Sequence, residues 1–291
     1  MTTIQDWQRQ GERLLFAGHE IFCRDSGVNS GDEDAPVLLL IHGFPTASWD
    51  WHELWEPLCV THRVMTLDML GFGLSDKPKR FCYSIMKQAD LCESFLRDRD
   101  VSHYHILAHD YGDTVAQELL ARQQCNVAAA SIESICFLNG GLFPETHHPV
   151  LIQRLLLSPL GPLLAKQFAF KRFVTQFNNV CAREIAQEDL QSLWSLICHK
   201  EGLVVMPKLI RYMVERKELR ERWVGALTAS NIPMRLIDGL LDPVSGAHMV
   251  SRYRELVPNA NVVELVDVGH YPQLEAPNDV LAAAFDFWRQ L

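Results

Sequence analysis

The chain is as informative in what it lacks as in what it contains. Among its 291 residues there is no apolar run of membrane-spanning length, which predicts that no segment inserts into a bilayer. There is also no run of five Lys or Arg residues, and the formal net charge is −9. This balance argues against nucleic acid and against an anionic membrane surface as partners.

Metal and disulfide motifs are missing as well. None of the eight cysteines is in a CxxC spacing, and Cys136 lies in an apolar stretch, as a small buried hydrophobe would. The pairs His103/His105 and His147/His148 have no third ligand at metal spacing, so neither a metal nor a cofactor is expected. The N-terminus has no basic region followed by an apolar one, which predicts no signal peptide. A reducing, cytoplasmic location is therefore expected.

What is present is an alternation of strands and helices. Continuous apolar strands typical of a parallel sheet alternate with helical segments, after an initial hairpin at residues 14–24. This pattern predicts a doubly wound α/β fold with a mostly parallel sheet. The expected strands are residues 37–41, 63–67, 104–108, 134–138, 234–237 and 262–266, and the expected helices are residues 48–58, 85–97, 114–122 and 280–289.

The alternation is interrupted once. Residues 141–230 have no convincing strand and read as helical pieces, which predicts a cap, or lid, inserted into a core of residues 1–140 and 231–291. Within this cap the charged stretch at residues 215–222 is interpreted as a solvated helix face with ion pairs one turn apart.

The turn at Asp110 carries the chemistry. An apolar strand runs into a helix with the small residues Ala108 and Gly112 on either side, which is the steric pattern of a nucleophile elbow. The usual apex is Ser, whereas a carboxylate is already ionised and needs no base to attack. Asp suits displacement at a saturated carbon, which gives an alkyl ester that water later hydrolyses.

Two later loops complete a catalytic triad. Asp242 follows one expected strand and His270 the next, and the order nucleophile, acid, histidine is that of the α/β-hydrolase triad. His270 would activate water and Asp242 would hold its tautomer. Asp238 competes with Asp242 but is expected inside the strand. Asn139 stands where some relatives place their acid, but an amide cannot stabilise an imidazolium by charge.

An oxyanion hole is expected beside the elbow. The loop of His42, Gly43, Phe44 and Pro45 follows the first apolar strand, and the backbone N–H groups of Phe44 and Tyr111 would face the ester carbonyl on Asp110.

These residues resemble the branch of the α/β-hydrolase superfamily that contains the epoxide hydrolases and the haloalkane dehalogenases. More narrowly, the chain is similar to the vertebrate mesoderm-specific transcript proteins, hydrolases of uncertain substrate. The segments that carry the narrower resemblance are residues 109–113, 139–146, 222–227 and 270–275. The resemblance implies a small hydrophobic substrate and water as reactants.

The sequence departs from the dehalogenases in the groups that hold the halide. Tyr111 and Phe44 stand where those enzymes use an indole and, in many cases, an Asn. Trp49, Trp51, Trp194 or Trp223 would have to substitute, so dehalogenation is disfavoured. We expect the substrate to contact three aromatic residues, which are Trp51, Tyr111 and Trp194.

Epoxide hydrolases use tyrosines of the lid to protonate the opening ring, and Tyr212 is the single tyrosine of the insertion. The chain is therefore predicted to form an alkyl ester on Asp110 and to open an epoxide to a diol, with Tyr212 as the acid. Two alternatives stay open, a haloalkane dehalogenase and a binding or regulatory protein that has kept the fold.

Overall fold

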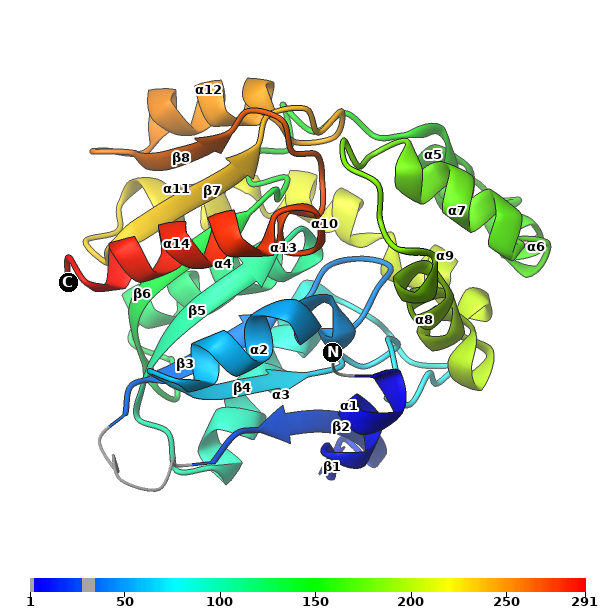
Figure 1. Ribbon diagram of the computed structural model, residues 1–291, viewed down its shortest axis with the longest axis horizontal. Helices are drawn as coiled ribbons and strands as arrows, with labels where there is room; N and C mark the ends of the chain where they lie inside the picture. Colours follow the sequence, from blue (N-terminus) through cyan, green and yellow to red (C-terminus); the bar gives the residue numbers. More distant parts are fainter. Residues whose placement is uncertain (1–2, 28–34) are drawn as a thin grey trace.

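The computed structural model describes residues 3–27 and 35–291, and it is built on one sheet flanked by helices (Figure 1). The described strands form an eight-stranded sheet of order β1-β2-β4-β3-β5-β6-β7-β8. The pairs β1/β2 and β2/β4 are antiparallel and all the others are parallel, which confirms the predicted fold class. The strands are β1 Glu12–Phe16, β2 His19–Asp25, β3 Val37–Ile41, β4 Arg63–Leu67, β5 His103–His109, β6 Ser131–Leu138, β7 Met234–Gly239 and β8 Asn261–Leu265.

Helices cover both faces of the sheet. In Figure 1, α2 and α14 lie in front of the strands, whereas α3, α4 and α11 lie behind them. The bounds are α1 Ile4–Arg9, α2 His52–Cys59, α3 Ile85–Asp98, α4 Tyr111–Gln124, α5 Leu151–Leu157, α6 Gly161–Lys166, α7 Phe170–Asn178, α8 Gln187–Cys198, α9 Met206–Leu209, α10 Tyr212–Glu218, α11 Arg220–Thr228, α12 Ala247–Leu256, α13 Pro272–Glu275 and α14 Pro277–Trp288, with the 3₁₀ helices η1 Ser48–Trp51 and η2 His199–Val204.

Every predicted strand is present. The inner strands are mostly apolar runs that the sheet buries between two layers, whereas β1 and β8 at the two edges are only partly buried. Three helices were not predicted. α1 is a short turn closed by a capping box between Thr3 and Asp6. α13 has four residues, and α12 buries only three apolar side chains, so both lack a long periodic signal.

Residues 141–230 contain the helices α5 to α11 and no strand, as expected. In Figure 1, α5 to α9 extend beyond the ends of the strands at one side of the sheet. The last helix of the segment, α11, packs instead against α4 behind the sheet. Nowhere in residues 3–27 and 35–291 is a helix both long and apolar enough to cross a membrane.

The chain order places a functional edge at β3 and β5. After β3 the chain moves to β4 on one side, and then crosses to β5 on the other. Ile41 at the end of β3 is in register with Ala108 near the end of β5, so the loops that follow both strands leave the same edge. Such a reversal of strand order opens a crevice at the carboxyl ends of the strands, where doubly wound folds bind ligands.

Candidate active site

The elbow is a strained turn between β5 and α4. Asp110 has φ 48° and ψ −101°, a conformation that side chains other than glycine rarely adopt. Gly112, in the first turn of α4, presses against β3. A Cβ atom there would lie 2.2 Å from the carbonyl oxygen of Ile41. The small residue that the sequence pattern singled out is therefore required by the approach of another strand's backbone.

The carboxylate of Asp110 is almost fully buried, and three groups surround it. The backbone N–H of Phe44 donates to Oδ2 at 3.1 Å. The hydroxyl of Tyr212 lies 3.5 Å from Oδ1, at the outer limit of a hydrogen bond. Arg216 donates from Nη2 to the backbone oxygen of Asp110 at 2.9 Å, and the same nitrogen is 3.8 Å from Oδ1. Tyr111 begins α4, so its amide has no acceptor one turn earlier within the helix.

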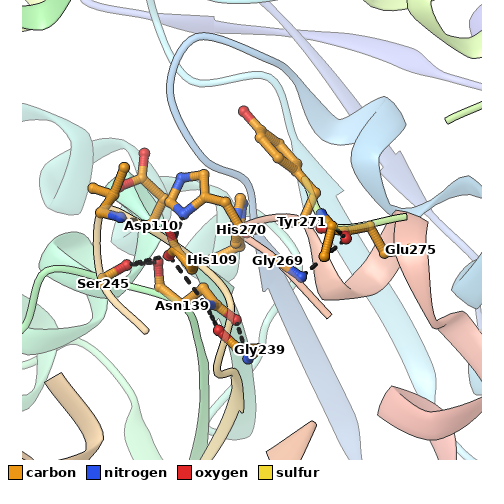
Figure 2. Close-up of polar contacts among 12 residues, drawn as sticks. His109, Asp110, Asn139, Gly239, Ser245, Gly269, His270, Tyr271 and Glu275 are labelled. Carbon is orange, nitrogen blue, oxygen red and sulfur yellow. Dashed lines mark hydrogen bonds and ion pairs between the residues drawn. The ribbon is translucent and has the colours of Figure 1, made fainter. Parts of the chain in front are cut away.

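His270 pairs with Asp242, and Figure 2 labels His270 together with its neighbours Asn139 and Ser245. The distance from His270 Nδ1 to Asp242 Oδ2 is 2.7 Å. Asp242 Oδ2 also accepts from Ser245 Oγ at 2.8 Å and from Asn139 Nδ2 at 3.1 Å, and Oδ1 accepts from the Val244 N–H at 2.7 Å. Asn139, at the position where some relatives carry the acid, thus donates to the carboxylate that contacts the histidine.

Asp238, the competing acid, lies inside β7. It is fully buried, and neither carboxyl oxygen has a hydrogen-bond partner among the residues that the structure describes. Burial, and then the charge of Asp242, raises the pKa of Asp238 well above its usual value. The structure therefore places Asp242, and not Asp238, against His270.

The imidazole of His270 is held in its charged form. Burial acts to lower its pKa, but the charge and hydrogen bond of Asp242, together with the charge of Asp110, raise the pKa of His270 to about 9. On Asp242 burial acts to raise the pKa, and His270 outweighs it, so the pKa of that carboxyl lies below its usual value.

This shift predicts a pH-dependent stability. The unfolded histidine titrates near pH 6.5, so between about pH 6.5 and 9 only the folded protein keeps the proton. The stabilisation is full below that window and is lost as the pH rises through it. The free energy of unfolding of the wild type relative to His270→Gln is expected to fall by up to about 3 kcal/mol across the window.

Denaturant titrations of both proteins at several pH values would measure this difference. Lys77, whose pKa burial lowers to about 8, is common to both proteins, so its titration cancels in the comparison. A difference that stays constant from about pH 6 to pH 9.5 would contradict the assignment of this proton to His270.

The loop that carries His270 is held by groups that the sequence did not reveal. Glu275 in α13 accepts backbone N–H bonds from Gly269 at 2.9 Å and from Tyr271 at 3.0 Å, which Figure 2 shows in part. His109, beside the elbow, contacts the backbone oxygen of His270 through Nε2 at 2.7 Å. These bonds fix the histidine loop to the elbow and to the start of the final helices.

The prediction that residues 215–222 form a solvated helix face was wrong for Glu215, Arg216 and Arg222. Arg216 is buried, and its Nε donates to Thr114 Oγ1 of α4 at 2.7 Å. Glu215 accepts from the N–H of Ile85, and Arg222 pairs with the buried Glu118 of α4 at 2.7 Å. These three charged side chains face α3 and α4 because α10 and α11 pack against those helices, which charge pattern alone does not indicate.

A mostly apolar cleft of about 610 Å³ reaches His270, and its lining does not include Asp110 or Tyr212. Phe44, His270 and Tyr271 form its inner wall, and the remaining wall comes mainly from α5 and α7. Phe177 of α7 stacks on Tyr271 with ring centroids 4.3 Å apart. The full lining is Phe44, Pro45, Val150, Ile152, Gln153, Leu156, Phe168, Phe173, Gln176, Phe177, Val180, Met206, Val244, His270 and Tyr271.

The three aromatic residues expected to contact substrate are not part of this lining. Trp51 is buried in η1. Trp194 packs behind the wall, with its ring centroid 5.5 Å from that of Phe173. The ring of Tyr111 packs against that of Tyr212, with ring centroids 4.8 Å apart. Whether an aromatic side chain lines the cleft depends on tertiary packing, which cannot be predicted from the residue type.

The indoles considered as halide ligands are likewise absent from the lining of the cleft. Trp223 donates its Nε1–H to Glu118 at 2.9 Å. The indole nitrogens of Trp49 and Trp51 are buried without a hydrogen-bond partner within the described ranges, yet neither residue lines the cleft. Those same ranges contain no cluster of three His, Cys, Asp or Glu side chains suited to a metal ion.

Comparisons with known proteins agree with this geometry. Residues 38–284 match the model of the alpha/beta hydrolase family. The mesoderm-specific transcript protein of Mus musculus is 42% identical over 296 residues, which cover 98% of this chain and 87% of that protein. The putative hydrolase LipZ of Mycobacterium tuberculosis is 35% identical over 97% of this chain and 96% of its own length.

Among solved structures, a loop variant of a haloalkane dehalogenase from Bradyrhizobium elkanii superposes with a TM-score of 0.79. It is 19% identical and the match covers 96% of this chain and 97% of that one, so it supports the fold alone. The two curated relatives confirm the resemblance that the residue motifs indicated.

Proposed function

Because this chain belongs to the alpha/beta hydrolase family, we propose that it hydrolyses its substrate through an alkyl ester on Asp110 and that the substrate is an epoxide, opened to a diol. The observation that carries the proposal is the pair of hydrogen-bond donors on either side of one carboxylate. Tyr212 lies 3.5 Å from Asp110 Oδ1 on one side, and the N–H of Phe44 bonds Oδ2 on the other.

In the first half-reaction a carboxylate oxygen of Asp110 attacks a ring carbon, and the bond from that carbon to the ring oxygen breaks. The oxygen leaves as an alkoxide, which must receive a proton as it forms. Tyr212 is proposed to donate this proton. Burial and then the charge of Asp110 raise the pKa of Tyr212 far above its usual value before the reaction.

Esterification changes that balance in favour of proton donation. The ester on Asp110 carries no charge, so the negative charge that raises the pKa of Tyr212 is removed. The guanidinium of Arg216 remains 4.5 Å from the Tyr212 ring centroid, and its charge lowers the pKa of the phenol. Tyr212 is therefore expected to become a stronger acid as the ester forms and the alkoxide develops.

Esterification removes the charge of Asp110, which is one of the causes that raise the pKa of His270, and the imidazole gives up its proton to solvent before it acts as a base. In the second half-reaction the neutral His270 takes a proton from water, and the oxygen of that water attacks the ester carbonyl carbon of Asp110. The charge develops on the carbonyl oxygen, where the Phe44 N–H supplies one donor and the Tyr111 N–H is proposed as the second. Removing one such donor typically costs about 3–4 kcal/mol of transition-state stabilisation. Collapse of the intermediate passes the proton of its new hydroxyl to the departing alkoxide, releases the diol and restores the carboxylate. The proton that His270 took from water then returns, through solvent, to the Tyr212 phenolate.

The lining of the cleft favours an apolar substrate. We propose that residues 141–230 act as the cap predicted from the sequence, because α5 and α7 line the cleft and α10 supplies Tyr212 and Arg216. An apolar cap excludes bulk water from the ester until His270 activates one molecule.

Replacing Tyr212 with Phe tests the substrate class. Loss of a positioned general acid is expected to lower turnover of a good epoxide by about 10²-fold or more. Bromide needs no proton as it leaves, so any reaction with a bromoalkane is expected to change only a few-fold. Steady-state rates with an aryl epoxide and with a bromoalkane would measure both.

Tyr253→Phe is the matched control, because its hydroxyl is buried without a partner in the described part of the chain and lies on α12. It should leave both reactions unchanged. If Tyr212→Phe turned over the epoxide as fast as the wild type, Tyr212 would not be the general acid. Turnover of a bromoalkane with none of any epoxide would assign the chain to dehalogenation instead.

A further inference from the structure

The cap helices α5, α6 and α7 extend beyond the sheet at one end of the molecule (Figure 1), and α5 and α6 carry exposed apolar side chains. Four leucines of α5, α6 and the turn between them point into solvent. Their exposed fractions are 69% for Leu151, 38% for Leu155, 62% for Leu160 and 58% for Leu163. Clustered exposed leucines of this kind mark an interaction surface rather than scattered surface residues.

The charge around this patch is of one sign. Residues 146–183 contain five basic residues and no acidic residue, although the whole chain has a net charge of −9. Four of the five are exposed and have no ion pair with any described residue, and they are Arg154, Lys166, Lys171 and Arg172. We call residues 151–172, which carry the four leucines and these four cations, the docking face.

The docking face is continuous with the cleft. A groove of about 630 Å³ has Leu151, Leu155 and Arg172 in its lining. It shares Ile152, Phe168 and Gln176 with the cleft that ends at His270. An apolar molecule bound at the docking face therefore has a path of apolar side chains to the site.

We propose that the docking face binds the surface of an anionic bilayer and that an apolar substrate enters the cleft from that bilayer. Short amphipathic helices with exposed leucines and flanking cations lie in the interface of a membrane without crossing it. Docking itself is independent of the reaction, whereas the entry of substrate rests on the proposed function.

The net charge of −9, taken over the whole chain, disfavours an anionic membrane as a partner, but it does not oppose binding at the docking face. Electrostatic interactions are screened beyond about 8–10 Å at physiological salt, so a membrane meets the local cations and not the distant acids. A second copy of the chain fits the face less well. In a symmetric dimer the same patch faces itself, which would bring like charges together.

Sedimentation with vesicles tests the docking. The full chain is expected to bind vesicles of equal parts phosphatidylcholine and phosphatidylserine at least about tenfold more tightly than vesicles of phosphatidylcholine alone, and added salt should weaken the binding. The charge variant Lys166→Glu/Lys171→Glu should lose about tenfold or more in affinity for the anionic vesicles. The apolar variant Leu160→Ser/Leu163→Ser should lose affinity by a similar factor.

Matched controls exist elsewhere on the surface. Leu15→Ser/Val60→Ser removes two exposed apolar side chains, and Arg80→Glu/Arg97→Glu reverses two exposed charges, all outside the cap. These should bind like the wild type. Equal binding to both kinds of vesicle, or none, would overturn the proposal. So would a dimer without lipid that the leucine variant dissociates, which would assign the face to a second copy.

The entry of substrate has a separate readout. The charge and leucine variants change residues outside the cleft lining, so their turnover of a short water-soluble epoxide should equal that of the wild type. Turnover of a long-chain epoxide held in anionic vesicles should fall about tenfold or more, in step with binding. Asp110→Ala should bind vesicles normally. These measurements distinguish a failure of the proposed reaction from a failure of membrane docking. If the charge and leucine variants turned over the long-chain epoxide in vesicles as fast as the wild type, entry of substrate from the bilayer would be overturned.

Discussion

Asp110→Ala is expected to have no turnover and to take up no label, whereas His270→Gln is expected to be alkylated once and then to stop. The carboxylate attacks without a base, but hydrolysis of the ester requires His270 to activate water. Turnover of His270→Gln should fall by about 10²–10⁴-fold, while one equivalent of epoxide adds to its mass. Intact-mass spectrometry after mixing each variant with an aryl epoxide would measure the adduct.

Asp113→Asn provides the control for this experiment. Asp113 is a buried carboxyl of α4, close to Asp110 in the chain, whose oxygens have no partner in the described ranges. Burial, and then the charge of Asp110, raises the pKa of Asp113 well above its usual value, so an amide imitates it closely. This variant should turn over and label like the wild type.

Two outcomes would contradict the mechanism. If an epoxide is turned over by the wild type but leaves no adduct on His270→Gln, the covalent route is wrong. If the wild type neither turns over nor retains any epoxide or bromoalkane, the chain is better described as a binding or regulatory member of its family.

Asp242→Asn is expected to slow hydrolysis of the ester by about 10⁴-fold, with a smaller effect on alkylation. Every neighbour of the Asp242 carboxylate is a hydrogen-bond donor, since Oδ1 accepts from Val244 and Oδ2 accepts from Asn139, Ser245 and His270. In either orientation the NH₂ group of an asparagine meets a donor. The imidazole also loses the negative charge that stabilises its protonated form.

Single-turnover kinetics, with alkylation and hydrolysis followed separately, would measure the effect. Asp238→Asn is the matched control, because Asp238 is equally buried but has no partner among the described residues and no contact with His270. It should leave both steps unchanged. If Asp242→Asn hydrolysed the ester at the wild-type rate, or if Asp238→Asn hydrolysed it much more slowly, Asp238 and not Asp242 would have to be the acid.

How far the sequence predicted this structure depends on whether a signal is local. The strand at residues 37–41 and the small residues around Asp110 were readable because periodicity and steric size act over a few neighbouring residues. The order of Asp110, Asp242 and His270 can likewise be read directly from the sequence. These features place the strand ends, and the strand ends place the loops.

What the sequence did not predict depends on packing between distant elements. Arg216 reads as a surface residue until α10 is laid on α4, where it reaches Thr114 and Asp110. Asn139 was weighed as a poor acid, whereas its role is to donate to Asp242 across β6 and β7. The positions of Trp51 and Trp194 outside the cleft follow from the same cause, since propensity says nothing about which layer an aromatic ring joins.

The guanidinium of Arg216 donates a hydrogen bond to the backbone oxygen of Asp110, in the turn that carries the nucleophile. The parts of the inserted segment are therefore expected to differ in how well they tolerate substitution. Its first helices meet the site through apolar rings such as Phe173 and Phe177, which other apolar residues can replace. Exchange of α5–α7 with the same segment of a relative should therefore alter which substrates fit, and exchange of α10 should remove the reaction. Divergence toward new substrates is expected to concentrate in residues 150–180, with α10 constrained as tightly as the strands.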